Sequence, residues 1–392
     1  MKKKLMLLGG IRYLLPVIKK AHELGAHVIT ADYLPGNIAH KYSDEYVNVS
    51  VLDREAVLAA ARERNIDGIL SFGVDPGVVT AAYVAERLNL SFPSLAAVEI
   101  LQNKDKFRDF LENNGFNCPK RYQPTDDIEY PVIVKPVDSA GSKGCSKVNS
   151  AAELSAAIEY ARSESHSGRI IIEQFLANAY SSSDTDSFSI DNDLVFCSFN
   201  CQHFDVRSPN PYTPAAYSWP SDMPLDAQAE LRGELQRLIR LLNLGTSIYN
   251  IETRVAIDGK PYIMEISPRG GGNRLSEVLE MGTGQSPIEN AVRGALRMPM
   301  REMKDPLYDG FWTEVIVHSN MDGAYRSLSI AENIRKKNLI QEDMWVSPGD
   351  HVSGFSGANQ AIGTLILRFD SIEASRSAMT NISEWLSVEV AE

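Results

Sequence analysis

Residues 246–274 read TSIYNIETRVAIDGKPYIMEISPRGGGNR and carry the signal that decides the fold. Asp258-Gly259 between two β-rich runs predicts a hairpin, because Asp-Gly favours the tight turn that joins antiparallel strands. A turn there pairs 257 with 260, 255 with 262 and 252 with 265, which places Glu252 opposite Glu265. The remaining side chains predict a buried apolar face made by Ile251, Thr253, Val255, Ile257, Tyr262, Met264 and Ile266.

Two carboxylates that face each other across a strand pair repel, so a fold that keeps them needs a compensating partner. A divalent cation bound by carboxylate oxygens supplies one. The second strand ends at Ser267 and is followed by Arg269, three glycines and Arg274, which puts fixed positive charge beside the supposed metal. The alternative is a solvated face whose glutamates only favour solubility, and the hairpin alone does not decide between the two.

Composition narrows the class of protein. The chain has 392 residues, 44% of them hydrophobic and 23% charged, which suits several globular domains. Its net charge of −12 argues against a nucleic-acid partner or an anionic membrane surface. The four cysteines show no metal-binding or disulfide spacing and predict a reducing, cytoplasmic location. The start, MKKKLMLLGG, resembles a secretory leader, but Arg12 and the glycines interrupt its apolar run, so we expect a buried first strand.

Strands and helices alternate over residues 1–93, which predicts a doubly wound parallel sheet. Gly9-Gly10 follows the first strand but lacks the full GxGxxG pattern, so an NAD-dependent function is the weakest alternative. Residues 204–224 are rich in proline and aromatic residues without a strand or helix period, and we expect a functional loop there. The last ninety residues predict a small α+β module.

Four further features occur in a fixed order. Lys104 begins a helix, and Lys135 ends the apolar strand PVIVKP just before the loop DSAGSKG at 138–144. Glu173 to Leu176 then close another apolar strand, and the paired glutamates of the hairpin follow. A lysine where burial is expected needs an anionic partner, and phosphate is a suitable one.

Together, in this order and spacing, these features resemble the ATP-grasp superfamily of carboxylate–amine ligases, most closely at NIETRV…DGKPYIMEISPR. The resemblance covers roughly residues 1–300, and the remainder is similar to the smaller C-terminal module of amino-acid and peptide ligases. It implies a mixed α/β and α+β multidomain fold, with an ATP-grasp domain of two α+β subdomains. The implied parts are a pre-ATP-grasp domain (1–93), a helical connector (94–120), a small lid subdomain (121–190), a large subdomain with the metal site (191–300) and a C-terminal module (301–392).

The resemblance also implies an ATP site. Lys104 and Lys135 would hold the phosphates, and Lys135 would also be catalytic, as a charge buried at a strand end. Glu173 would accept a hydrogen bond from the adenine amino group. A loop would cover the β- and γ-phosphates; its residues are Ser139, Gly141, Ser142, Lys143 and Gly144. A short segment would recognise the base; its residues are Gln174, Phe175 and Leu176.

The same resemblance implies that Glu252 and Glu265 hold Mg²⁺ or Mn²⁺. Arg269 would neutralise charge on the transferred phosphoryl group or the acyl phosphate as a catalytic residue, and Arg274 would clamp a substrate carboxylate. Ser267 is also an implied metal ligand, but the family has asparagine at this position. A serine hydroxyl is a poorer metal ligand than an amide oxygen.

A second departure is the missing ribose-binding glutamate, for which Asp184 or Asp186 are the candidates. His203 and Arg207 are candidates for the acceptor pocket. Tyr212 and Tyr217 are expected to be surface-loop residues.

The implied reaction activates a small carboxylate as an acyl phosphate, with release of ADP, and transfers it to an amine or similar nucleophile. Its partners would be small molecules, with neither nucleic acid nor membrane, in a possible homodimer. Two alternatives stay open: a carboxylating or carbamoyl-phosphate-type enzyme that activates bicarbonate, and an ATP-binding protein without turnover.

Overall fold

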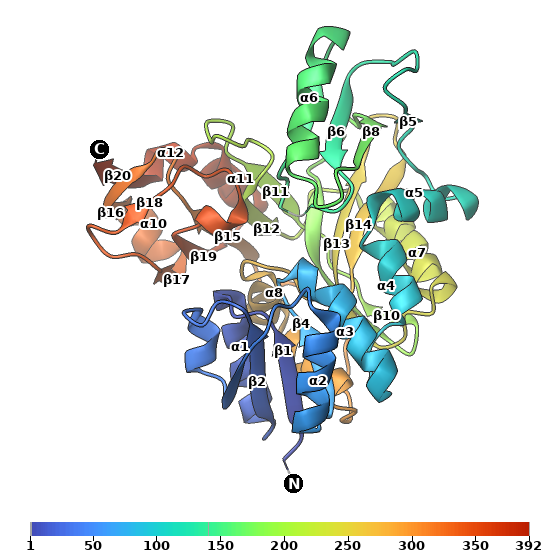
Figure 1. Cartoon of the computed structure of the whole chain (residues 1–392). Helices are drawn as coiled ribbons and strands as arrows, with labels where there is room; N and C mark the ends of the chain where they lie inside the picture. The colour runs from blue at the N-terminus through green and yellow to red at the C-terminus, as the bar shows by residue number, and fades with distance from the viewer. Residues whose placement is uncertain (1, 140, 392) are drawn as a thin grey trace.

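The computed structural model describes residues 2–139 and 141–391; Ala140, inside the predicted phosphate loop, lies outside the described residues. Over these residues the strands form five sheets, one of them parallel, and the predicted α/β and α+β multidomain fold is confirmed. Figure 1 shows three bodies around a common centre: the N-terminal domain, a lid that contains α6, and a C-terminal module.

The N-terminal domain is a parallel sheet in the order β3-β2-β1-β4. Its strands are β1 (Lys4–Leu8), β2 (His27–Asp32), β3 (Glu45–Asn48) and β4 (Gly68–Ser71). Its helices are η1 (Arg12–Leu14), α1 (Leu15–Glu23), η2 (Ile38–Lys41), α2 (Arg54–Arg64) and α3 (Asp75–Leu88). Leu5 and Leu7 pack with α1, whereas Met6 and Leu8 pack with α2 and α3, so both faces are covered as predicted.

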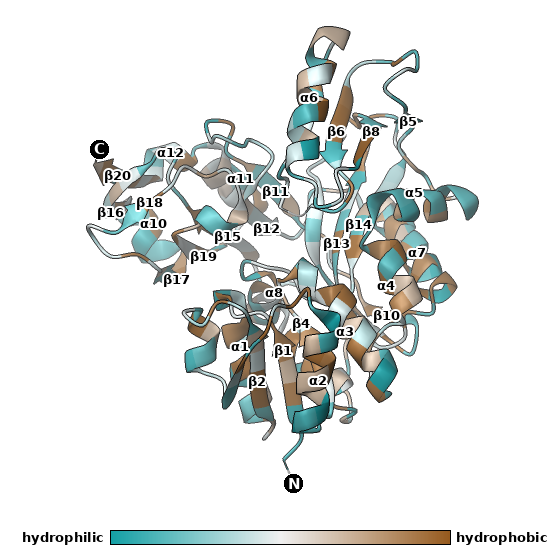
Figure 2. Ribbon diagram, viewed as in Figure 1, coloured by the Kyte–Doolittle hydropathy of each residue, from teal (hydrophilic) through white to brown (hydrophobic). Residues whose placement is uncertain are grey.

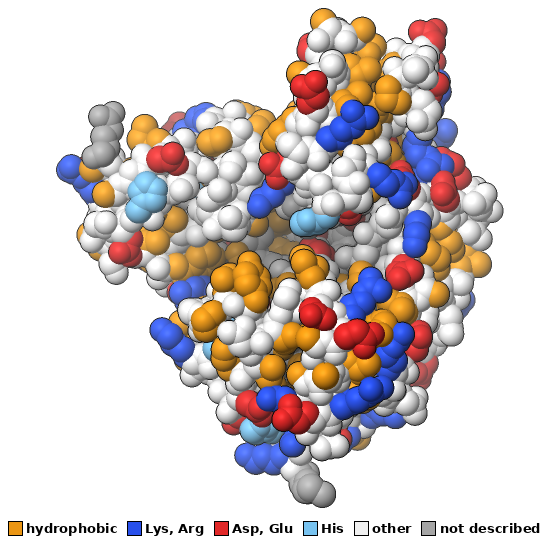
Figure 3. Space-filling view, in the orientation of Figure 1, with side chains coloured by type: hydrophobic (Ala, Val, Ile, Leu, Met, Phe, Trp, Pro, Cys, Tyr) orange, Lys and Arg blue, Asp and Glu red, His pale blue; other side chains and the backbone are white. Residues whose placement is uncertain are grey.

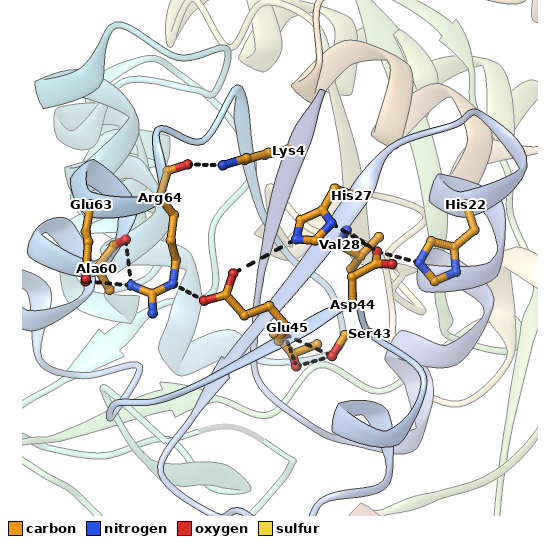
Figure 4. Close-up of polar contacts among 11 residues, drawn as sticks. Lys4, His22, His27, Val28, Ser43, Asp44, Glu45, Ala60, Glu63 and Arg64 are labelled. Atoms are coloured by element: carbon orange, nitrogen blue, oxygen red, sulfur yellow. Dashed lines mark hydrogen bonds and ion pairs between the residues drawn. The ribbon is translucent and has the colours of Figure 1, made fainter. Parts of the chain in front are cut away.

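A chain of polar contacts joins the amino ends of these strands (Figure 4). Asp44 accepts from His22 at 2.9 Å, and Arg64 donates to Glu45 at 2.6 Å. His27 lies between the two carboxylates, 3.8 Å from Asp44 and 4.0 Å from Glu45. Ligands of parallel sheets bind at the carboxyl ends of the strands. The contacts at the amino ends therefore stabilise the domain, and the carboxyl ends face the candidate site.

Two helices and the lid follow. The helices are α4 (Leu95–Leu101) and α5 (Lys104–Asn113), and the lid contains β5 (Arg121–Tyr122), β6 (Val132–Pro136), β7 (Ser146–Val148), α6 (Ala151–Ser163) and β8 (Ile170–Gln174). The lid sheet has the order β5-β8-β6-β7 and ends at Gln174. The predicted lid boundary at residue 190 is therefore too late, because β9 (Ser183–Ile190) hydrogen-bonds to another sheet.

That central sheet has the order β10-β9-β13-β14 and is backed by α7 (Leu225–Leu241). Its other strands are β10 (Asp193–Phe196), β13 (Ser247–Val255) and β14 (Pro261–Ser267). Glu252 lies directly opposite Glu265, as predicted. Nearer the turn a bulge shifts the register by one residue, so Val255 pairs with Pro261 and not with residue 262.

Because of the bulge, the buried face of the hairpin differs from the predicted one. Ile263 packs with Ile251 and Val255 in the core under α7, whereas Tyr262 and Met264 join a separate cluster with Leu176 and Ala256. Ile257, expected inside, is 74% exposed because it lies beyond the last paired residue. One inserted residue reverses the side on which later side chains lie.

The C-terminal module draws on strands from earlier in the chain. β11 (Cys201–Phe204) and β12 (Pro214–Trp219) pair with β15 (Phe311–Val317), β19 (Gly363–Phe369) and β17 (Leu339–Met344) in one sheet. A second sheet holds β16 (Gly323–Ile330), β18 (His351–Val352) and β20 (Leu386–Ala391). The helices are α10 (Glu332–Lys337), η3 (Ala358–Gln360), α11 (Ile372–Thr380) and α12 (Ile382–Trp385).

Two predictions about this region are wrong. Residues 204–224 are not a continuous loop, since they include β12, and the module does not begin at residue 301. Residues 215–219 are all buried, so this strand shows no alternation that would reveal it in the sequence.

Two later helices complete the core: α8 (Leu275–Thr283) and α9 (Pro287–Ala295). Ala291 and Val292 of α9 share a buried cluster with Val17 and Ile18 of α1. Figure 2 shows the strands of the N-terminal sheet as largely hydrophobic between mixed helix surfaces. Among the described helices, none is long and apolar enough to cross a membrane.

Candidate active site

Three carboxylates form a row across adjacent strands of the central sheet. Asp184 of β9 lies opposite Glu252 of β13, which lies opposite Glu265 of β14. Two residues along, on the same face, Asn250 lies between its ladder partners Asp186 and Ser267. Asn250 Nδ2 donates to Asp184 Oδ1 at 2.8 Å. The central sheet therefore gathers carboxylate, amide and hydroxyl side chains on one face.

Lysine and arginine side chains neutralise this row. Lys104 Nζ lies 2.9 Å from Glu265 Oε1 and also donates to Ser139 O at 3.1 Å. Arg254 lies 2.5 Å from Glu252. Partial desolvation opposes ionisation of the half-exposed Glu265, but Lys104 and then Lys135 outweigh it and lower the pKa of this carboxyl. Glu265 is thus held as a carboxylate, the form that binds a metal.

Lys135 is buried, as predicted, and its partner is Glu173 at 2.6 Å. Glu173 is fully buried and also accepts from Arg108 Nε at 2.5 Å. Arg108 extends the network to the hairpin, because its Nη1 donates to Met264 O at 2.9 Å. Sequence reasoning missed Arg108, since an arginine in an amphipathic helix reads as a solvated residue; its side chain is fully buried.

Arg269 is held by Asp75, the first residue of α3. Nε and Nη2 of Arg269 each donate at 2.8 Å to the two oxygens of Asp75, in a bidentate pair. Ser267 donates to Asp75 at 3.2 Å and accepts from Gln102 at 2.9 Å. Its predicted role as a metal ligand stays a prediction. Asp75 was missed, although an Asp-Pro helix start just after β4 could have indicated it.

The Gly/Ser loop turns by left-handed backbone at Gly141, Ser142 and Gly144, with φ of 68°, 58° and 73°. Its tip reaches other parts of the chain: Asn210 donates to Ser142 O at 3.2 Å and to Ser356 O at 3.1 Å. Lys143 is exposed at this tip. Through Asn210, the described part of the loop is therefore linked to the C-terminal module.

Comparison with known proteins matches the middle of this chain to one family. Residues 101–273 match the family described as ATP-grasp domain. Over these residues the chain carries an ATP-grasp domain. A formate-dependent phosphoribosylglycinamide formyltransferase of Erythrobacter litoralis is 28% identical over 186 residues, 44% of this chain and 47% of the relative. The same enzyme of Prochlorococcus marinus subsp. pastoris is 26% identical over 314 residues, 76% and 77% of the two chains.

A solved L-amino acid ligase from Bacillus licheniformis superposes with a TM-score of 0.83 at 20% identity, covering 100% of this chain and 99% of that one. This likeness shows the fold. The match to the first relative spans about half of that relative's length, so the activity and substrates of the whole protein are matters for proposal.

In the segment expected to recognise adenine, two backbone N–H groups already donate hydrogen bonds within the protein. Gln174 N–H donates to Lys120 O at 2.8 Å, and Phe175 N–H donates to Pro131 O at 3.1 Å. Base recognition by these two residues would therefore use their carbonyl groups. Leu176 is buried in a small apolar cluster with Met264 and Tyr262, a surface that suits a flat base. The predicted adenine contact of Glu173 does not fit the structure, because this carboxylate is fully buried and its oxygens are held by Arg108 and Lys135.

The two ribose candidates differ in access. Asp186 is fully buried, with Gly271 N–H and the Ser276 hydroxyl on its oxygens, so a ribose does not reach it. Asp184 is half-buried, and burial together with Glu252 raises its pKa to about 7. Tyr217, expected on a surface loop, is buried on β12 and donates to Asp184 at 3.3 Å.

The predicted acceptor residues are not brought together. Arg207 is exposed and bonded to Asp205 at 3.0 Å, and Tyr212 is half-buried in the same loop. His203 lies on β11 against Ser218 at 2.8 Å, and burial lowers its pKa to about 4. Arg274 is held by Glu277 at 2.8 Å and lines a cleft.

This cleft has a volume of about 760 Å³ and lies between α1 and β17. Its inner residues come from the N-terminal domain, α8 and the C-terminal module; they include Arg12, Tyr13, Arg274, Glu277, Gln341 and Trp345. Figure 3 shows the molecule hollowed where these parts and the lid meet.

Gly144→Ala tests the phosphate loop. A Cβ at Gly144 would lie 2.7 Å from Pro136 Cγ, and φ is 73°, so we expect strain of about 1–3 kcal/mol and a displaced loop. The KM for ATP should rise roughly tenfold for each 1.4 kcal/mol lost. Gly141→Ala is the matched control, because φ is 68° but no atom lies within 4 Å. Equal effects of the two changes on KM would contradict a specific fit at Gly144.

Proposed function

We propose that this ATP-grasp protein is an ADP-forming ligase that activates a small-molecule carboxylate as an acyl phosphate and transfers it to an amine. The single observation that carries the proposal is the pair Glu252 and Glu265, facing each other beside the lysines Lys104 and Lys135. A protein that merely bound nucleotide would have no need to keep two repelling carboxylates at the phosphate end of the site.

The carboxylate pair fits Mg²⁺. Among the residues that the structure describes, no three metal-binding side chains form a cluster, but Mg²⁺ usually takes one or two carboxylates and completes its shell with water and substrate phosphates. Glu265 and Glu252 are the two ligands of this kind, and Ser267 follows on the same face. When bound, the ion would neutralise charge on the phosphoryl group in transfer.

The residues of the chain would position the phosphates. Lys135 is already oriented by Glu173, so it needs no reorganisation when ATP binds. Lys104 joins Glu265 to the start of the loop at Ser139. The loop would cover the phosphates and exclude water from the acyl phosphate, an intermediate that water would destroy.

Arg269 would stabilise charge at the reacting centre. Its guanidinium is fixed by two hydrogen bonds from one side, to Asp75, and lies in the field of Asp184 and Asp186. A cation held in place before the reaction lowers the barrier without paying for its own orientation. The carboxylate of the first substrate would attack the γ-phosphate of ATP in line, and the amine would then attack the acyl carbon and expel phosphate.

The names of the two sequence relatives make formate the first carboxylate to test, and the solved amino-acid ligase adds amino acids. The experiment measures ADP and phosphate release from Mg·ATP with each carboxylate, with and without an amine. Release that requires one carboxylate and one amine is the expected result. Release with bicarbonate alone would replace this proposal with the carboxylating function, and AMP with pyrophosphate would refute phosphoryl transfer to the carboxylate.

A further inference from the structure

Glu314 lies in the middle of β15 and is fully buried. Its Oε1 accepts from Arg274 N–H at 2.9 Å, whereas Oε2 has no hydrogen-bond partner among the described residues. A buried carboxyl oxygen without a partner is costly and uncommon in a folded protein. The ATP site described above does not use this group.

The nearest cation is committed elsewhere. The guanidinium of Arg274 donates to Glu277 at 2.8 Å and to Gln341 at 2.5 Å, and only its backbone reaches Glu314. Burial, with repulsion from Glu277 and Asp184, raises the pKa of Glu314 to about 8 despite Arg274. With no cation bonded to its side chain, the surroundings of Glu314 favour the protonated carboxyl, and a bound cation would favour the ionised form.

Glu314 also lies between the two places that the proposed reaction must connect. On one side, Tyr217 is its ladder partner on β12 and donates to Asp184, the end of the carboxylate row. On the other side, Tyr13 lines the cleft, donates to Asn273 at 3.0 Å, and has its pKa raised by burial and then by Glu314. Glu314 is fully buried near Tyr13 and does not itself line the cleft, so a molecule from the cleft reaches it by displacing Tyr13.

We propose that Oε2 of Glu314 binds the ammonium group of the amine acceptor, which enters through the cleft between α1 and β17. The inference rests on the proposed ligase function and names the group that selects its second substrate. A carboxylate paired with an ammonium in a water-poor site forms a strong charge-assisted hydrogen bond. An uncharged nucleophile has no need of this contact.

The test measures formation of the acyl phosphate and its transfer to the amine separately. Hydroxylamine is uncharged at pH 8 and traps acyl phosphates as hydroxamates, so it reports the first step alone. In Glu314→Gln the amide oxygen still accepts from Arg274 N–H, but the charge is lost. We expect the KM for the amine, measured with glycine and with the amine that gives the fastest ADP release, to rise at least tenfold. Hydroxamate formation should stay within about twofold of wild type.

Glu389→Gln is the matched control, an exposed glutamate on β20 of the same module that accepts a hydrogen bond from the Ser327 hydroxyl. It should leave both rates unchanged. An unchanged KM for the amine in Glu314→Gln would overturn the assignment, whereas absence of hydroxamate in wild type would refute the proposed function instead.

Thermal unfolding at pH 8 gives an answer that needs no substrate. A carboxyl kept for a ligand is unpaired in the free protein, so Glu314→Gln should unfold at the same temperature as wild type or higher. A clear fall in the unfolding temperature would show that Glu314 serves the fold, and would overturn the assignment.

Discussion

Glu265→Ala is expected to reduce Mg²⁺-dependent ADP formation by a factor of at least about 10² while leaving the fold intact. The side chain is half-exposed at the end of a hairpin whose apolar partners lie on the other face, so its removal costs little packing. It would remove one of the two facing carboxylates and release Lys104 from its ion pair. Steady-state ADP release and the unfolding temperature measure the two effects separately.

A second measurement tests the metal assignment without turnover. The Mn²⁺ concentration needed for ADP binding should rise in Glu265→Ala, because one carboxylate ligand is gone. Glu230→Ala, at an exposed position of α7, is the control and should behave as wild type. Full activity in Glu265→Ala, or an unchanged Mn²⁺ requirement, would refute the metal site.

Arg108→Met is expected to have the largest effect on stability. It removes a buried cation and leaves Glu173, which is fully buried, with Lys135 alone. Loss of one partner from such a network typically costs about 3–5 kcal/mol, since the remaining charge is left uncompensated. The unfolding temperature should fall by on the order of 10 °C. An unfolding temperature close to that of wild type would mean that Glu173 does not depend on Arg108.

The double variant Arg108→Met/Glu173→Gln distinguishes charge from packing. If the penalty is the stranded carboxylate, the second change should recover part of the stability that the first one lost. If the penalty is the lost packing of the arginine, the two losses should add. The double variant still leaves Lys135 without its partner, so full recovery is not expected.

The same network predicts a pH dependence. Burial alone would raise the pKa of Glu173, but Arg108 and then Lys135 outweigh it and lower the pKa from 4.5 to about 2. Because the folded pKa is below the unfolded one, ionised Glu173 stabilises the protein above pH 4.5, and this contribution is lost as pH falls toward 2. The stability difference between wild type and Arg108→Met should therefore shrink over this range. A constant difference would contradict the coupling.

The sequence determined the parts of this protein that depend on local pattern. Asp258-Gly259 and the alternation around it fixed the hairpin, and Glu252 faces Glu265 as predicted although a bulge lies between that pair and the turn. Lys135 was recognised as a buried charge because it interrupts an apolar strand. The alternation of strands and helices over residues 1–93 gave the parallel sheet. Period, turn chemistry and burial act over a few residues, and so they can be read along the chain.

Only the tertiary structure decided which distant groups meet. Arg108 and Glu173 are 65 positions apart, and Asp75 and Arg269 are 194 apart, so neither ion pair leaves a local signature. Because β12 is buried on both faces, its sequence lacks the alternation that would have predicted a strand. The pairing of its Tyr217 with Glu314 could therefore not be predicted either. Long-range pairing of buried charges depends on how sheets and helices from separate segments pack together. The identity of each partner is therefore fixed in space and not in the order of residues.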